Sequence, residues 1–183
     1  MTTFRNTWIM RQTWEHLLFA HWPVSVETLR KLLPAELEVD TFDGQAWIGI
    51  IPFQMSAVRL RFFPEIPFTS RFPEVNLRTY VTANGLPGVF FLTLDASNPF
   101  IVNVARWWYH LPYFTAKMSF AEMRGHIHFS SERNGCANRP KQIHGRYAPL
   151  SAPFSAKAGS LEHWLMERYR LYCRCPRTHR VSH

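Results

Sequence analysis

The chain has 183 residues, of which 46% are hydrophobic and 19% are charged, and this balance fits one globular domain with a buried core. The formal net charge is +8 and the isoelectric point is near 9.9, but the basic residues are scattered, with the densest stretch between Arg170 and His183. We therefore expect a solvated basic tail rather than a nucleic-acid-binding surface, and no nucleic-acid partner.

The N-terminal stretch and the cysteines predict a cytoplasmic protein. Arg5, Arg11 and Glu15 interrupt the first apolar stretch, which excludes a signal peptide and a membrane span there. The three cysteines are an odd number, and without a secretory signal they fit a reducing compartment. The Cys173–Cys175 spacing is too short for a zinc knuckle. We therefore expect no metal, no cofactor and no membrane partner.

The first elements in chain order are a segment that fits either a helix or a strand, and a short helix. Residues 10–19 fit both a helix and one face of a strand. Ser25 is a good N-cap for a helix over residues 26–33, whose leucines share one face. Pro34 ends this helix.

A β-hairpin follows the short helix. Residues 37–42 alternate between apolar and polar, and Asp43-Gly44 is a two-residue turn signal. The return strand over residues 45–53 is apolar on both faces, which predicts a central position in the sheet. Residues 54–63 alternate again as a further strand, and the prolines at 64, 67 and 73 predict a loop.

The second half of the chain continues the β pattern. Residues 75–81 and 89–94 predict two adjacent antiparallel strands, joined by a turn over residues 83–88. Residues 127–133 predict a late strand. Two segments stay ambiguous: residues 99–106 fit a strand or a helix, and residues 140–158 carry little signal. Ser160 is an N-cap candidate for a last helix ending near Tyr169. The predicted fold class is mainly antiparallel β with flanking helices, an α+β domain.

One predicted strand carries polar residues on one of its faces. Glu74, Asn76, Arg78 and Tyr80 alternate with Val75, Leu77 and Val81, so the two sets point to opposite sides. The polar face is either exposed to solvent or the inside of a polar-lined barrel, and periodicity alone favours exposure. Motifs for phosphate loops, serine-hydrolase elbows and zinc proteases are not found.

Five ordered motifs carry a family resemblance. They are residues 17–23 (LLFAHWP), residues 72–81 (FPEVNLRTYV), residues 87–91 (PGVFF), Ala105-Arg106 with Leu111-Pro112-Tyr113, and residues 167–172 (ERYRLY). In this order they resemble the YqjF-like family of unknown function. Members of that family usually continue into further strands, and residues 173–183 match none of that continuation. The resemblance therefore implies a domain over residues 1–172 that is incomplete at its C-terminus, and a poorly packed basic tail over residues 173–183 beside an unpaired sheet edge.

The family is similar to acetoacetate decarboxylase, which implies a β-barrel or cone with flanking helices and a central cavity. In that enzyme a lysine forms a Schiff base with a β-keto acid. Tyr113 occupies the matching position here, Phe114 occupies that of the next lysine, and Lys117 lies four residues further on. Because a phenol cannot condense with a carbonyl, the resemblance argues against acetoacetate decarboxylation by this route.

The same resemblance implies a candidate cavity formed by His21, Glu74, Arg78, Arg106 and Tyr113. An arginine there would hold a small carboxylate bidentately, and Tyr113 would donate a hydrogen bond to it. The alternative is that Glu74 and Arg106 form a buried ion pair that orders the barrel.

Three functions remain open from the sequence. The first is a small-molecule-binding β-barrel protein whose cavity suits a small anionic ligand. The second is an enzyme of unassigned acid–base reaction on a small organic acid, with Glu74 and Tyr113 as the acid–base groups. The third is a structural or partner-binding protein without a ligand. Oligomer formation is compatible with all three.

Overall fold

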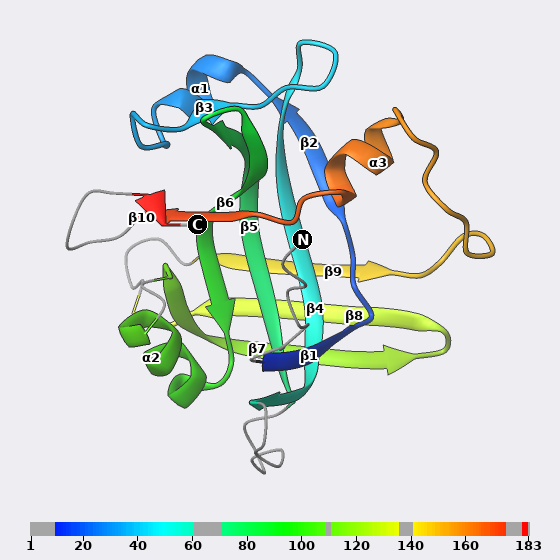
Figure 1. Ribbon diagram of the computed structural model, residues 1–183. Helices are drawn as coiled ribbons and strands as arrows, with labels where there is room; N and C mark the ends of the chain where they lie inside the picture. The colour runs from blue at the N-terminus through cyan, green and yellow to red at the C-terminus, as the bar shows by residue number, and fades with distance from the viewer. Residues whose placement is uncertain (1–9, 61–70, 109–110, 136–140, 175–180, 183) are drawn as a thin grey trace, which may run out of the picture.

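The computed structural model describes residues 10–60, 71–108, 111–135, 141–174 and 181–182 (Figure 1). In chain order the elements are β1 (Met10–Glu15), β2 (Ala20–Val24), α1 (Val26–Arg30), β3 (Glu38–Val39), β4 (Ala46–Leu60), β5 (Phe72–Ala83), β6 (Leu86–Ala96), α2 (Pro99–Trp108), β7 (Tyr113–Met123), β8 (His126–Arg133), β9 (Gln142–Tyr147), α3 (Leu161–Met166), β10 (Leu171–Arg174) and β11 (Val181–Ser182). The described chain is therefore mainly β, as the sequence predicts.

A curled sheet carries the fold. Its strands follow the order β1-β4-β5-β6-β7-β8-β9, with β2, β3 and β10 paired to β4, β5 and β6 off this path. Neighbours on the path are antiparallel except β6 and β7, which are parallel and are connected by α2 as a crossover helix. In Figure 1, β7, β8 and β9 run across the direction of β4, β5 and β6, so the sheet bends sharply after β6.

The long strand β4 replaces two predicted strands. The two segments expected over residues 45–53 and 54–63 form one strand of 15 residues. Its first part pairs with β2 and its last part pairs with β1, so residues 10–15 are a strand rather than a helix. A β-bulge lies in β4 at Ala57, which has a φ of 52°, because two residues of β4 and one of β1 lie between the pairs Arg11–Arg59 and Thr13–Ser56.

The β5–β6 hairpin is confirmed. Residues 75–81 lie antiparallel to residues 88–95, and the turn is formed by Asn84 and Gly85, both with positive φ. The observed turn is shorter than the predicted one over residues 83–88, because Gly88 already lies in β6. A Cβ atom on Gly88 would lie 2.6 Å from a ring carbon of Tyr172, so this glycine lets β10 pack closely against β6.

The helices follow their capping signals. Ser25 and Ser160 each accept a hydrogen bond from a backbone N–H three residues on, as expected for N-caps. Both helices are shorter than predicted, and the ambiguous segment over residues 99–106 is helical. The strands β2, β7 and β9 lie in segments for which no strand was predicted. Of the loop prolines, Pro73 lies in β5 and the other two lie outside the described residues.

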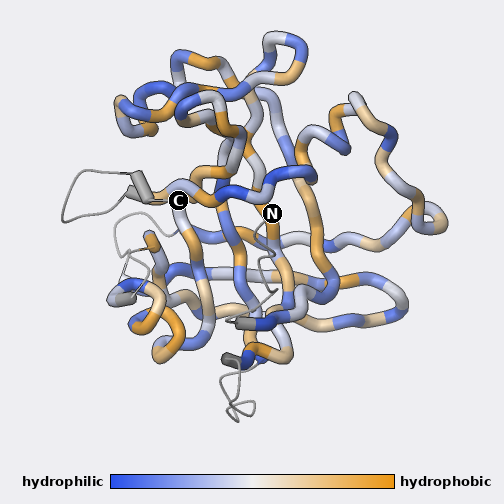
Figure 2. Tube along the Cα trace, in the orientation of Figure 1, coloured by the Kyte–Doolittle hydropathy of each residue, from blue (hydrophilic) through white to orange (hydrophobic). Residues whose placement is uncertain are grey.

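The buried residues form three apolar clusters around the central strands. One contains Leu33, Val81, Phe90 and Tyr172 between α1, β5, β6 and β10. Another gathers Ile51, Phe53, Met55, Phe72, Ala96 and Val102 from β4, β5, β6 and α2. Hydrophilic residues also run along the central strands, as Figure 2 shows, and Glu74, Asn76 and Arg78 of β5 are buried.

The C-terminal segment differs from the expected loose tail. Leu171 and Tyr172 pair in parallel with Val89 and Phe90 of β6, and Cys173 is buried. Leu171 therefore has a strand partner on the side of β6, and Cys173 is packed against the rest of the chain. Most of the remaining tail, over residues 175–180 and 183, lies outside the described residues. Within the described part, no helix combines the length and the apolar character needed to cross a membrane.

Candidate functional site

A cavity of about 500 Å³ lies on one face of β5 and β6. Its walls come from β1, β4, β5, β6, α2, the start of β7 and the segment over residues 166–171. That last segment crosses in front of β4, β5 and β6 (Figure 1). Most of the lining side chains are apolar. Polar groups enter from β5, Tyr113, Gln12 and residues 168–170.

The polar face of β5 is buried and lines this cavity. Glu74, Asn76 and Arg78 are 2%, 1% and 7% exposed, and all three contribute to its wall. The expectation that this face is exposed is therefore wrong. The physical reason is that α2 and residues 166–171, which are distant in the sequence, cover β5 on this side.

Glu74 and Tyr113 form one hydrogen-bonded pair. The Tyr113 hydroxyl donates to Oε2 of Glu74 across 3.0 Å. Tyr113 reaches this position because it lies opposite Leu94 in the parallel β6–β7 ladder, on the cavity face. The structure thus brings together two of the predicted site residues that are 39 positions apart.

Burial changes the protonation of this pair. Loss of solvent raises the pKa of Glu74 to about 8, an effect opposed by the hydrogen bond from Tyr113 and increased by the negative charge of Asp95. Burial also raises the pKa of Tyr113 well above its ordinary value. At neutral pH Glu74 is therefore mainly protonated, and this end of the cavity carries little negative charge.

Arg78 is the third predicted residue that lines the cavity. Its Nη2 atom donates to the hydroxyl of Tyr80 at 3.3 Å, and its guanidinium lies 4.9 Å from the ring centre of Phe19. Its Nε atom is buried without a hydrogen-bond partner, and so is Oδ1 of Asn76. Among the described residues, none of the ion pairs includes Arg78.

His21 supports Arg78 from outside the cavity wall. His21, Gly49 and Arg78 lie side by side on β2, β4 and β5, and the hydroxyl of Tyr80 is 2.7 Å from Nε2 of His21. Because Arg78 can only donate to Tyr80, the hydroxyl hydrogen of Tyr80 is free for His21. Burial and the charge of Arg78 lower the pKa of His21 to about 4, so its ring is neutral and can accept.

Gly49 makes room for this arrangement. A Cβ atom on Gly49 would lie 2.6 Å from Nε2 of His21. The missing side chain lets the imidazole reach over β4 toward Tyr80.

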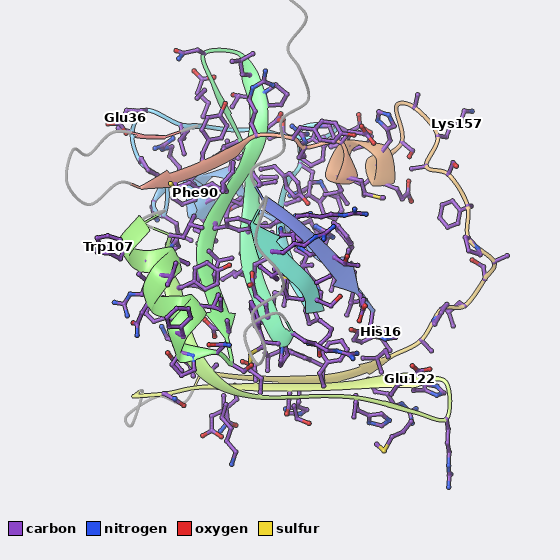
Figure 3. All side chains as sticks on the ribbon, turned by 60° about the horizontal axis from the view of Figure 1, so that its bottom comes forward. His16, Glu36, Phe90, Trp107, Glu122 and Lys157 are labelled. Atoms are coloured by element: carbon purple, nitrogen blue, oxygen red, sulfur yellow. The ribbon has the colours of Figure 1, made fainter. Side chains whose placement is uncertain are left out.

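Arg106 does not join the other candidates. Its side chain is exposed on α2, whereas the neighbouring Ala105 lines the cavity. One position further along the helix, Trp107 points outward from the molecule (Figure 3). The helical turn accounts for the difference, because Val102 and Ala105 take the inner face and leave Arg106 outside. A buried Glu74–Arg106 ion pair is accordingly not formed.

The lysines of the chain, Lys31, Lys117, Lys141 and Lys157, are all exposed and lie outside the cavity lining. Lys117 faces Glu132 on the neighbouring strand, and Lys157 lies on the long loop between β9 and α3, away from β5 (Figure 3). Within the described part of the chain, no three His, Cys, Asp or Glu residues are placed to hold a metal ion.

Sequence reasoning missed two residues of this site. Asn76 shares the two-residue period of Glu74 and Arg78, and this alternation was signal enough to include it. Arg168 also lines the cavity, where its Nη1 atom donates to Asp40 at 2.6 Å and its Nε atom donates to the carbonyl of Trp164. Its place depends on a contact between residues 128 positions apart, for which the sequence offers no local sign.

Comparison with known proteins identifies relatives over almost the whole chain. The family model DUF2071, described as an uncharacterized conserved protein, matches residues 11–183. The uncharacterized protein YqjF of Bacillus subtilis (strain 168) is 50% identical over 165 residues, which are 90% of this chain and 67% of that protein. The resemblance to the YqjF-like family is thereby confirmed.

Solved structures resemble the fold at low sequence identity. Acetoacetate decarboxylase from Legionella pneumophila subsp. pneumophila str. Philadelphia 1 has 12% identity and a TM-score of 0.54, over 70% of this chain and 51% of that chain. The enduracididine biosynthesis enzyme MppR complexed with pyruvate has 13% identity and a TM-score of 0.53, over 72% and 55%. An acetoacetate decarboxylase-like enzyme from Sphingomonas wittichii RW1 has 18% identity and a TM-score of 0.52, over 65% and 51%. The chain thus spans about half the length of these structures, and the likeness shows an acetoacetate decarboxylase-like fold.

Proposed function

The chain belongs to the DUF2071 family of uncharacterized conserved proteins, and we propose that it binds a small organic anion in the cavity beside β5, with Arg78 as its counter-ion. The observation that carries the proposal is the state of Arg78. Arg78 is only 7% exposed, its Nε atom has no hydrogen-bond partner, and no carboxylate of the described residues pairs with it. A buried charge without a partner is costly, and a bound anion removes that cost.

The surroundings of Arg78 favour a carboxylate with an apolar body. The cavity walls are mainly aliphatic and aromatic, and its volume of about 500 Å³ lies in the range of small-molecule sites. A guanidinium holds a carboxylate through two parallel hydrogen bonds. Glu74 is mainly protonated at neutral pH because its pKa is about 8, so it does not repel an anion.

The proposal involves no Schiff base. Tyr113 is at the position that the resemblance assigns to the lysine of acetoacetate decarboxylase, and a phenol cannot form an iminium. A pyruvate complex of another protein of this fold supports an anionic ligand, although its sequence identity to this chain is only 13%.

The proposal is tested by thermal unfolding with matched ligands. Octanoate is expected to raise the melting temperature as its concentration rises, because it binds the folded state alone. Octanamide has nearly the same shape without the charge and is expected to have little effect. Equal shifts with both compounds, or no shift with octanoate and with shorter acids, would contradict an anion site.

A second candidate function is acid–base catalysis on the bound acid, favoured by the pKa of about 8 for Glu74. A carboxyl group that titrates near neutral pH can both donate and accept a proton. Deuterium incorporation at the carbon next to the carbonyl of 2-oxooctanoate, followed by NMR, tests this function. Wild-type protein is expected to accelerate the exchange and Glu74→Gln to lose the acceleration, while equal exchange with both proteins would exclude it.

A further inference from the structure

We propose that the anion held by Arg78 carries a hydroxyl group on its second or third carbon, so that the ligand class is a hydroxy acid with an apolar chain. This inference rests on the proposed function and deepens it. It follows from the second unpartnered atom of the cavity, Oδ1 of Asn76, which the anion proposal alone leaves unexplained.

Asn76 and Arg78 each have one buried atom without a hydrogen-bond partner, and both residues line the same cavity. Both side chains are at least nine-tenths buried, both line the cavity, and they are two residues apart on one face of β5. Alternate residues of a strand are separated by about 7 Å along its axis. Nε of Arg78 can only donate a hydrogen bond, and Oδ1 of Asn76 can only accept one.

A hydroxy acid satisfies both atoms with one head group. Its carboxylate accepts from Nε of Arg78, and its hydroxyl, one or two carbons away, donates to Oδ1 of Asn76. A hydroxyl also accepts hydrogen bonds. Glu74, next in the same row, lies on the side of Asn76 away from Arg78 and can donate to the hydroxyl oxygen when it is protonated.

Related acids leave Asn76 unsatisfied or add an unfavourable charge. An oxo acid and an unsubstituted acid have no donor for Oδ1, and a site built around a hydroxyl disfavours analogues without it. An amino acid brings a donor together with a positive charge, into a cavity that already contains Arg78 and Arg168. The apolar chain is accommodated by the walls from β6 and α2, which include Phe91, Leu94 and Ile101.

Isothermal titration of the whole chain with four eight-carbon acids tests the inference. The probes are 2-hydroxyoctanoate, 3-hydroxyoctanoate, 2-oxooctanoate and octanoate. At least one hydroxy acid is expected to bind about tenfold or more tightly than both octanoate and 2-oxooctanoate, because it alone pairs the buried acceptor. Equal affinities for all four acids, or tighter binding of the oxo acid, would overturn the inference while leaving the anion site intact. If none of the four binds, the proposed function itself fails.

A pair of variants assigns the preference to Asn76. Asn76→Leu is expected to abolish the preference for the hydroxyl group and to keep binding of octanoate. Asn103→Leu makes the same change at an exposed position of α2 outside the cavity lining and is expected to keep the preference. A preference that survives in Asn76→Leu would overturn the assignment. Should that variant not fold, the wild-type series still decides the ligand class.

Discussion

Arg78 and Arg133 are equally buried, but the fold neutralises them differently. Each is 7% exposed. Arg133 donates two hydrogen bonds to Asp95, from Nη2 at 2.5 Å and from Nε at 3.2 Å. Arg78 has no carboxylate partner among the described residues and borders a cavity. The fold thus supplies Arg133 with a counter-charge, whereas Arg78 can take its counter-charge from a ligand.

The two arginines, from β5 and β8, lie on opposite faces of the β5–β6 ladder. Asp95 is opposite Val75 in the β5–β6 ladder, so its side chain points away from the face that carries Glu74 and the cavity. The neighbouring residues of β7 follow this division. Tyr113 bonds Glu74 on the cavity side, and the ring of Phe114 lies 3.9 Å from the guanidinium carbon of Arg133.

The largest expected effect comes from breaking the ion pair between Arg133 and Asp95. Asp95→Asn leaves Arg133 buried without a counter-charge and is expected to lower the free energy of unfolding by about 3–5 kcal/mol. Urea unfolding at neutral pH measures this loss. Asp43→Asn, the same change at an exposed hairpin position, serves as the control and is expected to change stability by less than about 0.5 kcal/mol. Similar losses in the free energy of unfolding for both variants would show that Arg133 does not depend on Asp95 for its counter-charge.

A pH-dependent loss of stability is expected on the cavity side. The pKa of Glu74 rises from 4.5 to about 8 on folding, so the folded state holds a proton that the unfolded state releases between these values. This group therefore contributes a decline of about 1.4 kcal/mol per pH unit as the pH rises from about 5 to 8. Glu74→Gln keeps a neutral acceptor for Tyr113 and is expected to remove that decline. An unchanged pH slope in urea unfolding of Glu74→Gln would show that Glu74 is ionised in the folded protein.

An intermediate effect is expected at Arg168, which also lines the cavity but is paired. Its partner Asp40 has a side chain that is 20% exposed, and Arg168 keeps its bond to the carbonyl of Trp164 when the pair is broken. Asp40→Asn is therefore expected to cost about 1–2 kcal/mol in urea unfolding. A loss as large as that of Asp95→Asn would indicate that exposure does not moderate these pairs.

The smallest effect on stability is expected at Arg78 itself. Without ligand, Arg78→Leu removes a buried charge that has no carboxylate partner among the described residues, so the free energy of unfolding is expected to stay unchanged or to rise by about 1 kcal/mol. Chemical denaturation of the ligand-free protein measures it. A loss of more than about 2 kcal/mol would mean that the fold already satisfies this guanidinium and has no need of an anion.

Local signals predicted the parts of the fold that depend on neighbouring residues. The Asn84-Gly85 turn sets the β5–β6 hairpin through residues that tolerate positive φ, and the serine caps set two helix starts. The Asp43-Gly44 turn also forms, with Phe42 bridged to Gln45, but the hairpin predicted around it is wrong, because Glu38 and Val39 pair with β5 instead of β4. The strand β7 was not predicted, although Ala116, Met118 and Phe120 alternate along it. The burial of β5's polar face could not be read locally, since the covering elements come from other parts of the chain.

The candidate site was likewise predicted in part, and its long-range contacts were not predicted. The spacing of Glu74 and Arg78 placed both on one face of a strand, and the resemblance added Tyr113. Arg106 was misplaced because a match of motifs fixes a position in the chain but not the side of a helix on which the side chain projects. His21 was assigned to the cavity, whereas it acts through the hydroxyl of Tyr80, a contact across 59 residues.

Arg78, rather than Arg106, is the proposed counter-ion of a bound carboxylate. Isothermal titration of octanoate into Arg78→Leu and Arg106→Leu tests it most directly, because both changes remove one positive charge and only Arg78 lines the cavity. We predict that Arg78→Leu loses detectable binding and that Arg106→Leu binds octanoate like the unchanged protein. Binding that persists in Arg78→Leu, or that is lost in Arg106→Leu alone, would contradict the account.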